Sequence, residues 1–467
     1  MDNNFDVIFI GGGPGGYVGS IRCSQLGFKV ACVDLNKDLG GCCGRIGCVP
    51  SKSLLHSSEM YKKAQKEFDS LGIEFKNIKL NLAKMMSNKE KTVSILARGV
   101  EFLFKKNKIT HLKGKGSIIS NSTVTVTDDS GKKIDYKAKH IVISTGSSPS
   151  TLPNINIDEK TVCSSTGILS LKKVPKKLCI IGGGYIGLEM GSVWSRLGSA
   201  VTMIEYLPKV VPEMDADVSS EILKILQKQG ILFELDSKVT GVNTIKNTAV
   251  VDFTNNKSAK RQRLEFDQVL VAVGRKTNIS PDIIKLGIKL DNQKKIQVND
   301  KFETSTPNIY AIGDAISGPA LAHKASEEAI ALSENLKGQS GNVNYDCLPS
   351  IVYTKPEIGS VGKTEQQIKK LNTKFKSSKF PLIANSRAKI NHETEGFVKI
   401  IADAHSDKIL GVHIVASNAG EMIAEAAIAM EFSASSEDLA RTIFGHPSMS
   451  ESIKESAMAI DKRAIHF

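Results

Sequence analysis

Two cysteines separated by four residues, Cys43 and Cys48, are the side chains of this sequence whose spacing most favours redox chemistry. On a helix this spacing places the sulfurs about one and a half turns apart, so a disulfide needs a distorted turn or a loop. Gly44 and Gly47 would permit such a distortion. A helix N-terminus or a nearby cation would lower the pKa of one thiol and activate it. The pair therefore indicates a redox centre; a metal half-site or buried structural cysteines are the alternatives, and the sequence shows no second cluster of metal ligands.

A histidine and a glutamate near the C-terminus form a second candidate. His446 and Glu451 lie in the segment Gly-His-Pro-Ser-Met-Ser-Glu. A histidine beside a carboxylate is a common acid–base arrangement, because the carboxylate orients the ring. Ser448 and Glu451 also have the spacing of a capping box that opens the last helix. The motif alone leaves both interpretations open, and a dithiol elsewhere in the chain favours the acid–base role.

A pattern of strand, glycine-rich turn, helix and strand occurs twice, at residues 5–34 and 178–205. Each copy has Gly-x-Gly-x-x-Gly after an apolar strand and ends its second strand on an acid, 23 residues after the first glycine. The glycines are Gly11, Gly13 and Gly16, then Gly182, Gly184 and Gly187, and the acids are Asp34 and Glu205. Two copies in register predict two dinucleotide-binding units and hence two bound nucleotides.

The spacing matches the needs of a dinucleotide. The first glycine permits a tight turn, the second lets the backbone approach a pyrophosphate, and the third allows close packing of the helix, whose N-terminus faces the phosphates. The acid is then placed to accept ribose hydroxyls. Glu205 is followed by Tyr206, Leu207 and Pro208, with no arginine nearby. Because a carboxylate repels a 2′-phosphate, we expect NAD rather than NADP on the second unit; the alternative is that Glu205 is only a surface strand end.

Other apolar strands end in small residues, at 141–146, 269–274 and 309–314. Each could bring a backbone group or a carboxylate to a ligand at the carboxyl end of a parallel sheet. After residue 345, alternating segments at 396–401 and 408–414 predict antiparallel strands, and helices are expected at 420–433 and 449–461. The sequence therefore predicts two α/β units and a separate C-terminal α+β domain.

Composition is that of an ordinary globular protein. The 467 residues are 41% hydrophobic, and this length predicts two to four domains. The net charge of +13 is carried by dispersed lysines, which indicates a solvated surface or attraction to acidic partners or anionic cofactors; no motif supports nucleic-acid binding. No apolar run reaches the roughly 18 residues of a membrane span. The chain opens almost directly into a strand at Phe5, so we expect a cytoplasmic or already processed form.

Segments spread over essentially the whole chain resemble the pyridine nucleotide–disulfide oxidoreductase family, in particular its members that oxidise dihydrolipoyl groups. They are GGGPGGY, GG-x-C-x4-C-x-PSK, STGS, GGGYIGLE, VGR, AIGDAISGPALAHKA, ANSRAK, GVHIVASNAGEMI, HPSMSE and KRAIHF. The resemblance implies an α/β fold with two Rossmann-like dinucleotide-binding domains plus a C-terminal α+β dimerisation domain. We expect an FAD-binding domain at 1–148 with 275–344, an NAD-binding domain at 149–274 and the dimerisation domain at 345–467.

The resemblance also implies which residues hold the two cofactors, and it implies no metal. The FAD site would contain Gly11, Gly13, Gly16, Asp34, Lys52, Gly116, Thr145, Asp314, Ala320, Leu321, Ala322 and His323. The NAD site would contain Gly182, Gly184, Tyr185, Ile186, Gly187, Glu189, Glu205, Val239 and Gly274. Gly41, Cys42, Gly146, Ser147 and Arg275 are further residues expected to bind a cofactor.

A reaction follows from the resemblance. His446, oriented by Glu451, would take a proton from a dihydrolipoyl group, and the thiolate would attack a disulfide at Cys43, expected to be the more exposed sulfur. Cys48 would be released against the flavin, which delivers hydride to NAD+, with Tyr185 covering the flavin face where nicotinamide docks. His446 and Glu451 would come from the other subunit of a homodimer. The lipoyl group would be carried on acyltransferase subunits of 2-oxoacid dehydrogenase complexes or on a glycine-cleavage carrier protein, in bacterial cytoplasm or the mitochondrial matrix.

The sequence departs from the family pattern at a few positions. Gly44 and Arg45 replace the usual Leu-Asn, Cys42 replaces threonine, Phe444 replaces a histidine, and Asp34 is one methylene shorter than the usual glutamate. Arg45 adds positive charge beside the cysteine pair, so we expect it to stabilise a thiolate there. Cys42 opens a route to disulfide scrambling.

The sequence is compatible with two alternatives to this function. One is another disulfide reductase, acting on glutathione, trypanothione or mercuric ion. Glutathione-type enzymes usually bind NADP through arginines after the second unit, and mercuric and large thioredoxin reductases carry a C-terminal cysteine pair, whereas this chain ends Ile-His-Phe. The other is a non-catalytic FAD-bearing subunit, against which the complete set of cysteine, histidine and glutamate argues.

Overall fold

The structure is a computed structural model, and it describes residues 3–467. The chain forms two compact units. The first runs to Leu54 and includes Ala83–Ser150 and Gly274–Val343, and the second contains Leu55–Leu82, Thr151–Val273 and Asn344–Phe467. None of the helices formed by residues 3–467 has the length and apolar character to cross a bilayer.

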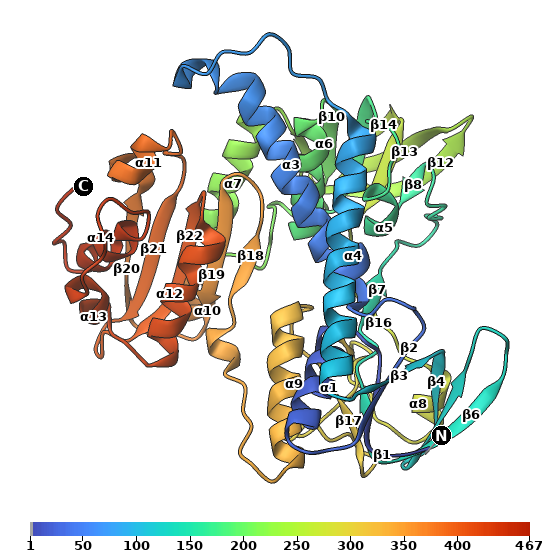
Figure 1. Cartoon of the computed structure of the whole chain (residues 1–467). Coiled ribbons are helices and arrows are strands. Elements are labelled where there is room, and N and C mark those ends of the chain that lie inside the picture. Colours follow the sequence, from blue (N-terminus) through green and yellow to red (C-terminus); the bar gives the residue numbers. More distant parts are fainter. Residues whose placement is uncertain (1–2) are drawn as a thin grey trace. The chain divides into compact units, whose positions relative to one another are not determined.

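A seven-stranded sheet is the centre of the first unit (Figure 1). Its strands pair in the order β3-β2-β1-β6-β5-β4, and β17 also pairs with β6. The pairs that involve β1, β2, β3 and β17 are parallel, which brings their carboxyl ends to one edge, while β4, β5 and β6 pair in antiparallel fashion. The strands are β1 (Asn4–Ile10), β2 (Val30–Asp34), β3 (Thr110–Lys113), β4 (Lys115–Ser120), β5 (Thr123–Thr127), β6 (Lys133–Ile143) and β17 (Ile309–Ala311).

Helices α1 and α9 pack together beside this sheet. Arg22 and Glu334 join the two helices through an ion pair of 2.6 Å, and the Sγ atom of Cys23 lies 3.2 Å from Ser333 Oγ. Buried aliphatic side chains of β1, β2 and β6 form the core beneath them. Helix α3 continues into the second unit after Leu54, and α4 starts at Leu82, the last residue of that segment of the second unit. The helices and the small sheet of the first unit are α1 (Pro14–Gln25), α2 (Gly41–Ile46), α3 (Cys48–Lys66), α4 (Leu82–Lys106), α8 (Pro281–Lys285), η2 (Gly313–Ala315), α9 (Ala322–Leu336), β7 (Ser147–Pro149) and β16 (Arg275–Thr277).

The second unit begins with a five-stranded parallel sheet of order β11-β10-β9-β15-β8 and a three-stranded antiparallel sheet, β12-β13-β14. The helices and strands of this part of the second unit are η1 (Asp69–Leu71), β8 (Val162–Cys163), α5 (Ser165–Ile168), β9 (Lys177–Ile181), α6 (Tyr185–Arg196), β10 (Ala200–Ile204), α7 (Ala216–Lys228), β11 (Leu232–Glu234), β12 (Ser237–Ile245), β13 (Thr248–Asn255), β14 (Arg261–Phe266) and β15 (Gln268–Val271). Strand, turn, helix and strand therefore follow each other as β9-α6-β10, as they do in β1-α1-β2. Both predicted units are present.

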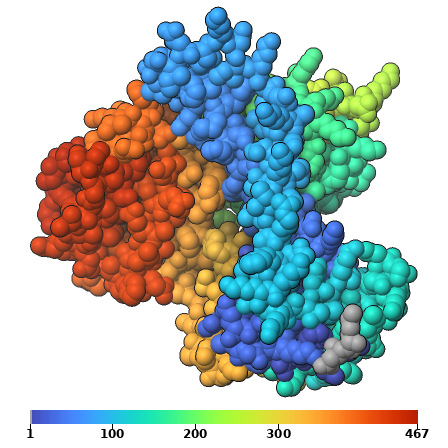
Figure 2. Space-filling model, in the orientation of Figure 1, coloured from blue at the N-terminus to red at the C-terminus, as the bar shows by residue number. Residues whose placement is uncertain are grey.

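Residues after 344 form a five-stranded antiparallel sheet of order β18-β19-β22-β21-β20. Helix α12 lies across β19 and β22, and α14 packs on β20 and β21 (Figure 1); the space-filling view shows this orange-to-red part as one continuous body (Figure 2). The predicted strands and helices are confirmed with shifts of a few residues. The elements are η3 (Tyr345–Cys347), β18 (Ser350–Val352), β19 (Glu357–Gly362), α10 (Glu365–Lys370), β20 (Phe375–Pro381), η4 (Leu382–Ala384), α11 (Ser386–Ile390), β21 (Phe397–Asp403), β22 (Ile409–Ala416), α12 (Ala419–Glu431), α13 (Ser436–Arg441) and α14 (Glu451–Ala459).

Candidate functional site

The first glycine turn depends on close backbone approaches. Gly11 has a φ of +109°, and a Cβ there would lie 2.3 Å from the carbonyl oxygen of Ser144. A Cβ on Gly16 would lie 1.7 Å from the Gly11 carbonyl oxygen, so α1 reaches β1 this closely only through glycine. Gly13 is the N-cap of α1 and forms no side-chain cap, which leaves first-turn N–H groups for a ligand. The turn fits the pyrophosphate of a dinucleotide such as FAD.

The second turn repeats this geometry in the second unit. A Cβ on Gly187 would lie 2.1 Å from the Gly182 carbonyl oxygen. Gly184 is the N-cap of α6, again without a side-chain cap, and apart from its two chain neighbours no described residue has an atom within 4 Å of a Cβ built there. Tyr185 begins the helix and is 40% exposed. The space in front of α6 is therefore open to a second dinucleotide.

Each acid at the end of the second strand binds the turn that it follows. The backbone N–H of Gly12 donates to Asp34 Oδ2 at 2.7 Å, and that of Gly183 donates to Glu205 Oε2 at 2.5 Å. The other carboxylate oxygen accepts the N–H of Asn36 in the first unit and of Leu207 in the second. A carboxylate oxygen has two lone pairs, so both acids can still accept a ribose hydroxyl.

The remaining residues predicted for NAD have different surroundings. Glu189 is buried one turn into α6, and its Oε1 accepts the N–H of Tyr353 at 3.1 Å. Ile186 is half-buried next to Tyr185, and Val239 packs against the apolar core of the second unit. Gly274 belongs to the first unit. Within the second unit, then, the structure brings together the turn at 182–187 and Glu205.

The segment 40–48, which carries the cysteine pair, packs against the first glycine turn. The N–H of Gly40 donates to the Gly12 carbonyl at 2.9 Å, and a Cβ on Gly41 would lie 2.6 Å from Gly13 Cα. Gly116 in β4 lies against the ends of β1 and β2, where a Cβ would sit 3.1 Å from Ile10 Cγ2. The cysteine pair therefore follows directly on the backbone that would hold FAD.

Helix breakage at Gly47 brings the two cysteines into contact. Helix α2 ends at Ile46 and α3 begins at Cys48, and the backbone between them is non-helical, with φ −136° and ψ −107° at Gly47. The sulfurs share a hydrogen bond, which together with burial raises the pKa of the Cys43 thiol; the charge of Lys52, one turn after Cys48, acts in the opposite direction. The predicted distortion is confirmed at Gly47, whereas Gly44 lies inside α2.

The expected exposure of the pair is wrong. Cys43 is half-buried and Cys48 is exposed in the chain by itself. The reason lies in the break at Gly47, because Cys43 is held within α2 while Cys48 starts a new helix.

A guanidinium joins several of the predicted cofactor residues. Arg275 donates from Nε to Ser147 Oγ at 2.7 Å and from Nη2 to the Ser147 carbonyl at 2.5 Å. The same Nη2 lies 3.4 Å from Cys42 Sγ, and the Ser147 hydroxyl donates to the Asp314 carboxylate. Cys42, Ser147, Arg275 and Asp314 therefore form one group at the edge where the parallel strands end.

Sequence reasoning missed Asn278, which braces the loop after β6. Its Nδ2 donates to the Thr145 carbonyl at 3.0 Å, its N–H to the Gly146 carbonyl at 3.0 Å, and its Oδ1 accepts the Ser148 hydroxyl at 2.6 Å. Thr145 Oγ1 donates in turn to the Asn278 carbonyl at 2.9 Å. The only signal is its place three residues after Arg275.

A buried ion pair that was also missed holds the turn of Asp314. Lys324 and Glu328 lie 2.8 Å apart with fully buried side chains, in the Lys-x-x-x-Glu spacing of one helix turn. Glu328 Oε2 accepts the N–H of Gly313 at 2.7 Å, and Lys324 Nζ donates to the Gly313 carbonyl at 3.1 Å. The segment Ala320–His323 leads into the same helix, with Leu321 as N-cap and Ala322 as first residue.

His446 and Glu451 form the predicted pair. His446 Nδ1 lies 2.9 Å from Glu451 Oε1, and Glu451 Oε2 accepts the N–H of Ser448 at 2.8 Å. Burial works against ionisation, but the Ser448 N–H and His446 hold the pKa of the Glu451 carboxyl below its ordinary value. Ser448 Oγ also accepts the Glu451 N–H at 3.3 Å, so the reciprocal bonds of a capping box coexist with the acid–base pair, although α14 begins at Glu451. Nε2 is left to exchange a proton with a substrate.

Comparisons with known proteins cover nearly the whole chain. Residues 5–329 match the family described as pyridine nucleotide-disulphide oxidoreductase, and residues 348–457 match its dimerisation domain. The chain is 50% identical over 462 residues to the mitochondrial dihydrolipoyl dehydrogenase of Pisum sativum, covering 99% of this chain and 92% of that protein. It is 49% identical to leghemoglobin reductase of Glycine max, covering 97% of this chain and 87% of that protein. The solved structure of LpdA from Mycobacterium tuberculosis has the same fold, with a TM-score of 0.90 at 24% identity over 97% of this chain and 99% of that one.

Proposed function

Because this chain belongs to the pyridine nucleotide-disulphide oxidoreductase family, we propose that its cysteine pair, its two glycine turns and its C-terminal histidine carry that family's reaction. The chain is an FAD- and NAD-dependent oxidoreductase with dihydrolipoyl dehydrogenase function, and it forms a homodimer. The observation that carries the assignment of residues is the Cys43–Cys48 contact beside the Gly11–Gly16 turn.

FAD is assigned to the first turn and NAD to the second. Gly13 and Asp34 would receive the pyrophosphate and adenosine ribose of FAD, while Asp314 would receive its ribityl chain. Gly184 and Glu205 would receive NAD. Bound FAD supplies the electron transfer between the cysteine pair and NAD+. We keep the boundaries 1–148 with 275–344 for the FAD domain, 149–274 for the NAD domain and 345–467 for the dimerisation domain.

The two cysteines have different roles in this proposal. Cys43 is the sulfur that exchanges with substrate and carries the proton in the reduced pair, which its raised pKa supports. Cys48 is the thiolate, because it stands at the N-terminus of the long helix α3, where the helix dipole favours negative charge. Exposure does not decide between them, since both sulfurs belong to one hydrogen-bonded pair.

Protons move through His446. Its Nε2 takes the proton of the first dihydrolipoyl thiol, and the substrate thiolate attacks Cys43 and releases Cys48 as a thiolate. The second substrate thiol then displaces Cys43, which closes the lipoyl disulfide and leaves the pair reduced. Glu451 orients the ring through the 2.9 Å contact at Nδ1. The histidine would be supplied to the pair by the other subunit of the homodimer.

The lipoyl group is proposed to arrive on a carrier protein, an acyltransferase subunit of a 2-oxoacid dehydrogenase complex or a glycine-cleavage carrier. The compartment is proposed to be bacterial cytoplasm or the mitochondrial matrix, in keeping with relatives of both origins.

The test is the formation of NADH by purified holoprotein from dihydrolipoamide and NAD+. Incubated with oxidised lipoamide, Cys48→Ser is expected to accumulate a mixed disulfide, formed when the Cys43 thiolate opens the lipoamide disulfide and detected by mass spectrometry, whereas Cys43→Ser is expected to form none. Absence of turnover by the wild-type protein would refute the proposed reaction. An adduct on Cys48 in Cys43→Ser, with none on Cys43 in Cys48→Ser, would reverse the two roles.

A further inference from the structure

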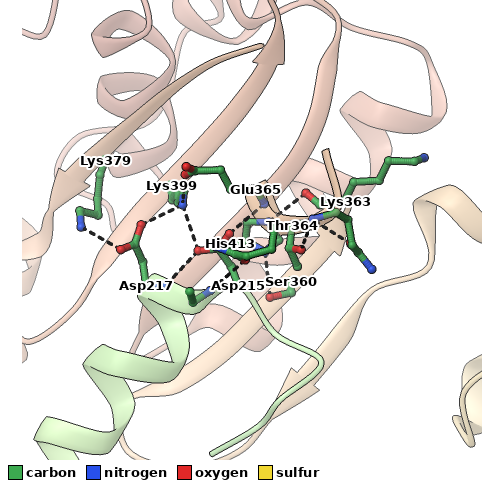
Figure 3. A network of polar contacts seen from close by, with 12 residues as sticks. Asp215, Asp217, Ser360, Lys363, Thr364, Glu365, Lys379, Lys399 and His413 are labelled. Atoms are coloured by element: carbon green, nitrogen blue, oxygen red, sulfur yellow. Dashed lines mark hydrogen bonds and ion pairs between the residues drawn. The ribbon is translucent and has the colours of Figure 1, made fainter. Parts of the chain in front are cut away.

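A buried lysine forms ion pairs with three carboxylates in the second unit (Figure 3). Lys399 lies in β21, and its side chain is 3% exposed. Its ammonium lies 2.9 Å from Asp215 Oδ1, 2.8 Å from Asp217 Oδ2 and 2.7 Å from Glu365 Oε2. A buried ammonium is tolerated only with such partners, so this contact fixes the three segments that supply the carboxylates.

Asp215 is the fully buried member of the three carboxylates, and it also accepts hydrogen bonds from two backbone N–H groups. Its Oδ1 also accepts the N–H of Asp217 at 3.0 Å and so caps the N-terminus of α7. Its Oδ2 accepts the N–H of Glu365, the first residue of α10, at 3.0 Å. Burial opposes ionisation, but the Glu365 N–H and Lys399 hold the pKa of the Asp215 carboxyl below its usual value. The carboxylate is therefore charged and tied to the C-terminal sheet.

His413 closes the network on the neighbouring strand. It is opposite Lys399 in the β21–β22 register, and its ring nitrogens lie 3.2 Å from Ser360 Oγ and 3.2 Å from the Lys363 carbonyl oxygen. Burial lowers the pKa of His413, so the ring is neutral and adds no charge at neutral pH. Lys379 reaches Asp217 from the half-exposed side at 3.6 Å. Lys399 is thus the charge that the buried Asp215 depends on.

The loop that ends at Asp215 begins at Glu205, the acid of the second nucleotide turn. Halfway along it, the N–H of Val211 donates to the Gly183 carbonyl at 2.9 Å. Val211 is buried and has a φ of +38°, a strained value for a β-branched residue. Strained backbone of this kind persists only when its surroundings hold it in place. Gly183 is therefore held by Glu205 at its N–H and by Val211 at its carbonyl, and Asp215 anchors the loop four residues later.

We propose that Lys399, acting through Asp215 and Val211, is a positioning residue for NAD. Without the ammonium, Asp215 would be a buried unpaired carboxylate, and the 206–215 loop would move to rehydrate it. Val211 would then relax, and Gly183 would lose its second anchor at the point where the dinucleotide phosphates approach. A residue of the dimerisation region thereby sets the affinity of the nucleotide turn. The inference rests on the proposed function only in taking NAD as the ligand of that turn.

The experiment compares Lys399→Met with a matched control in the FAD-loaded, full-length dimer. Isothermal titration measures NAD+ binding directly, and steady-state kinetics measure KM and kcat. Lys399→Met is expected to raise both Kd and KM for NAD+ by about threefold to thirtyfold, in line with couplings through packed networks. The rate of flavin reduction by dihydrolipoamide without NAD+ is expected to stay unchanged. Lys399→Arg should restore NAD+ binding, and the control Lys379→Met, which touches Asp217 only at the half-exposed side, should leave it unaltered.

Unchanged NAD+ binding in a folded Lys399→Met dimer with full FAD content would overturn the proposal. So would a matching loss in flavin reduction, since that would indicate general damage. If Lys399→Met does not fold, Lys399→Gln replaces it, because glutamine keeps a polar donor but removes the positive charge that Asp215 needs; a wild-type Kd for NAD+ in that variant also overturns the proposal. A wild-type protein that binds NAD+ but is not reduced by dihydrolipoamide would refute the proposed function and leave this comparison valid.

Discussion

Replacing Glu451 by glutamine isolates the charge that orients His446. The glutamine can still accept the Ser448 N–H, which now binds Glu451 Oε2 at 2.8 Å, so the local backbone should be retained. What is lost is the negative charge 2.9 Å from His446 Nδ1. In the proposed reaction, the imidazolium that forms as His446 takes the substrate proton would then have no counter-charge, and the ring would lose its preferred orientation.

The magnitude can be bounded from the geometry. A hydrogen bond to a charged group is worth about 1.5–3 kcal/mol when it is well shielded from water. The His446 side chain is 70% exposed in the single chain and Glu451 is 25% exposed, so solvent screening reduces this contribution to about 1–2 kcal/mol. At about 1.4 kcal/mol per factor of ten, kcat/KM for dihydrolipoamide should fall by about fivefold to thirtyfold.

The assay is NADH formation across a pH series, with flavin reduction by dihydrolipoamide as the isolated half-reaction. Glu455→Gln is the matched control, because Glu455 lies one turn further along α14 and its Oε1 binds His466 Nδ1 at 2.8 Å in the same manner. We expect Glu451→Gln to slow the half-reaction and Glu455→Gln to leave it within twofold of wild type. Equal rates for Glu451→Gln and wild type, or equal losses in both variants, would refute the orienting role.

Three further changes test other parts of the structure. Burial raises the pKa of the Glu357 carboxyl to about 7, above its ordinary value, so folding favours the protonated form and stability falls as pH rises from about 4.5 towards 7; Glu357→Gln should raise the free energy of unfolding by about 1–3 kcal/mol at pH 8 and by much less at pH 5, measured by urea denaturation. Lys324→Met should destabilise the protein by about 3–5 kcal/mol and lower its FAD content, since it removes the ammonium that lies 2.8 Å from the buried Glu328 carboxylate; the double change with Glu328→Leu should recover most of the loss, and a wild-type melting temperature in the single variant would contradict this. Arg45→Asn should make the reduction potential of the cysteine pair about 10–30 mV more negative, because the cation favours the thiolate; an unchanged potential and Cys43 thiol pKa would show that Arg45 has no such effect.

Local patterns were sufficient to predict the repeated nucleotide units. The glycine spacing, the apolar strand before each turn and the acid 23 residues later are all short-range features, and in the structure each acid does bind the glycine turn that it follows. The break between α2 and α3 was also predictable, because only a distorted turn allows the sulfurs of Cys43 and Cys48 to meet. The spacing does not decide whether the break lies at Gly44 or at Gly47, since both residues permit it.

Contacts between distant segments could not be predicted in this way. Lys399 and Asp215 are 184 residues apart, and nothing in their local sequence links a strand lysine to a helix cap. The same holds for Asn278 and Thr145, which are 133 residues apart. Lys324 and Glu328 are four residues apart, a spacing that predicts an ion pair on one face of a helix, but such pairs usually lie on the solvent-exposed surface. The relative exposure of Cys43 and Cys48 was predicted wrongly because it depends on where one helix stops and the next starts.

The Glu205 carboxylate has a consequence for how the nucleotide preference of this fold can change over time. The side chain proposed to repel a 2′-phosphate is buried, and its carboxylate also accepts the Gly183 N–H at 2.5 Å. A substitution that admits NADP therefore removes an internal brace of the turn in the same step. An evolving or engineered variant would therefore need a second change that gives the Gly183 N–H another acceptor before it could bind NADP. The nucleotide preference and the structure of the turn thus depend on the same side chain.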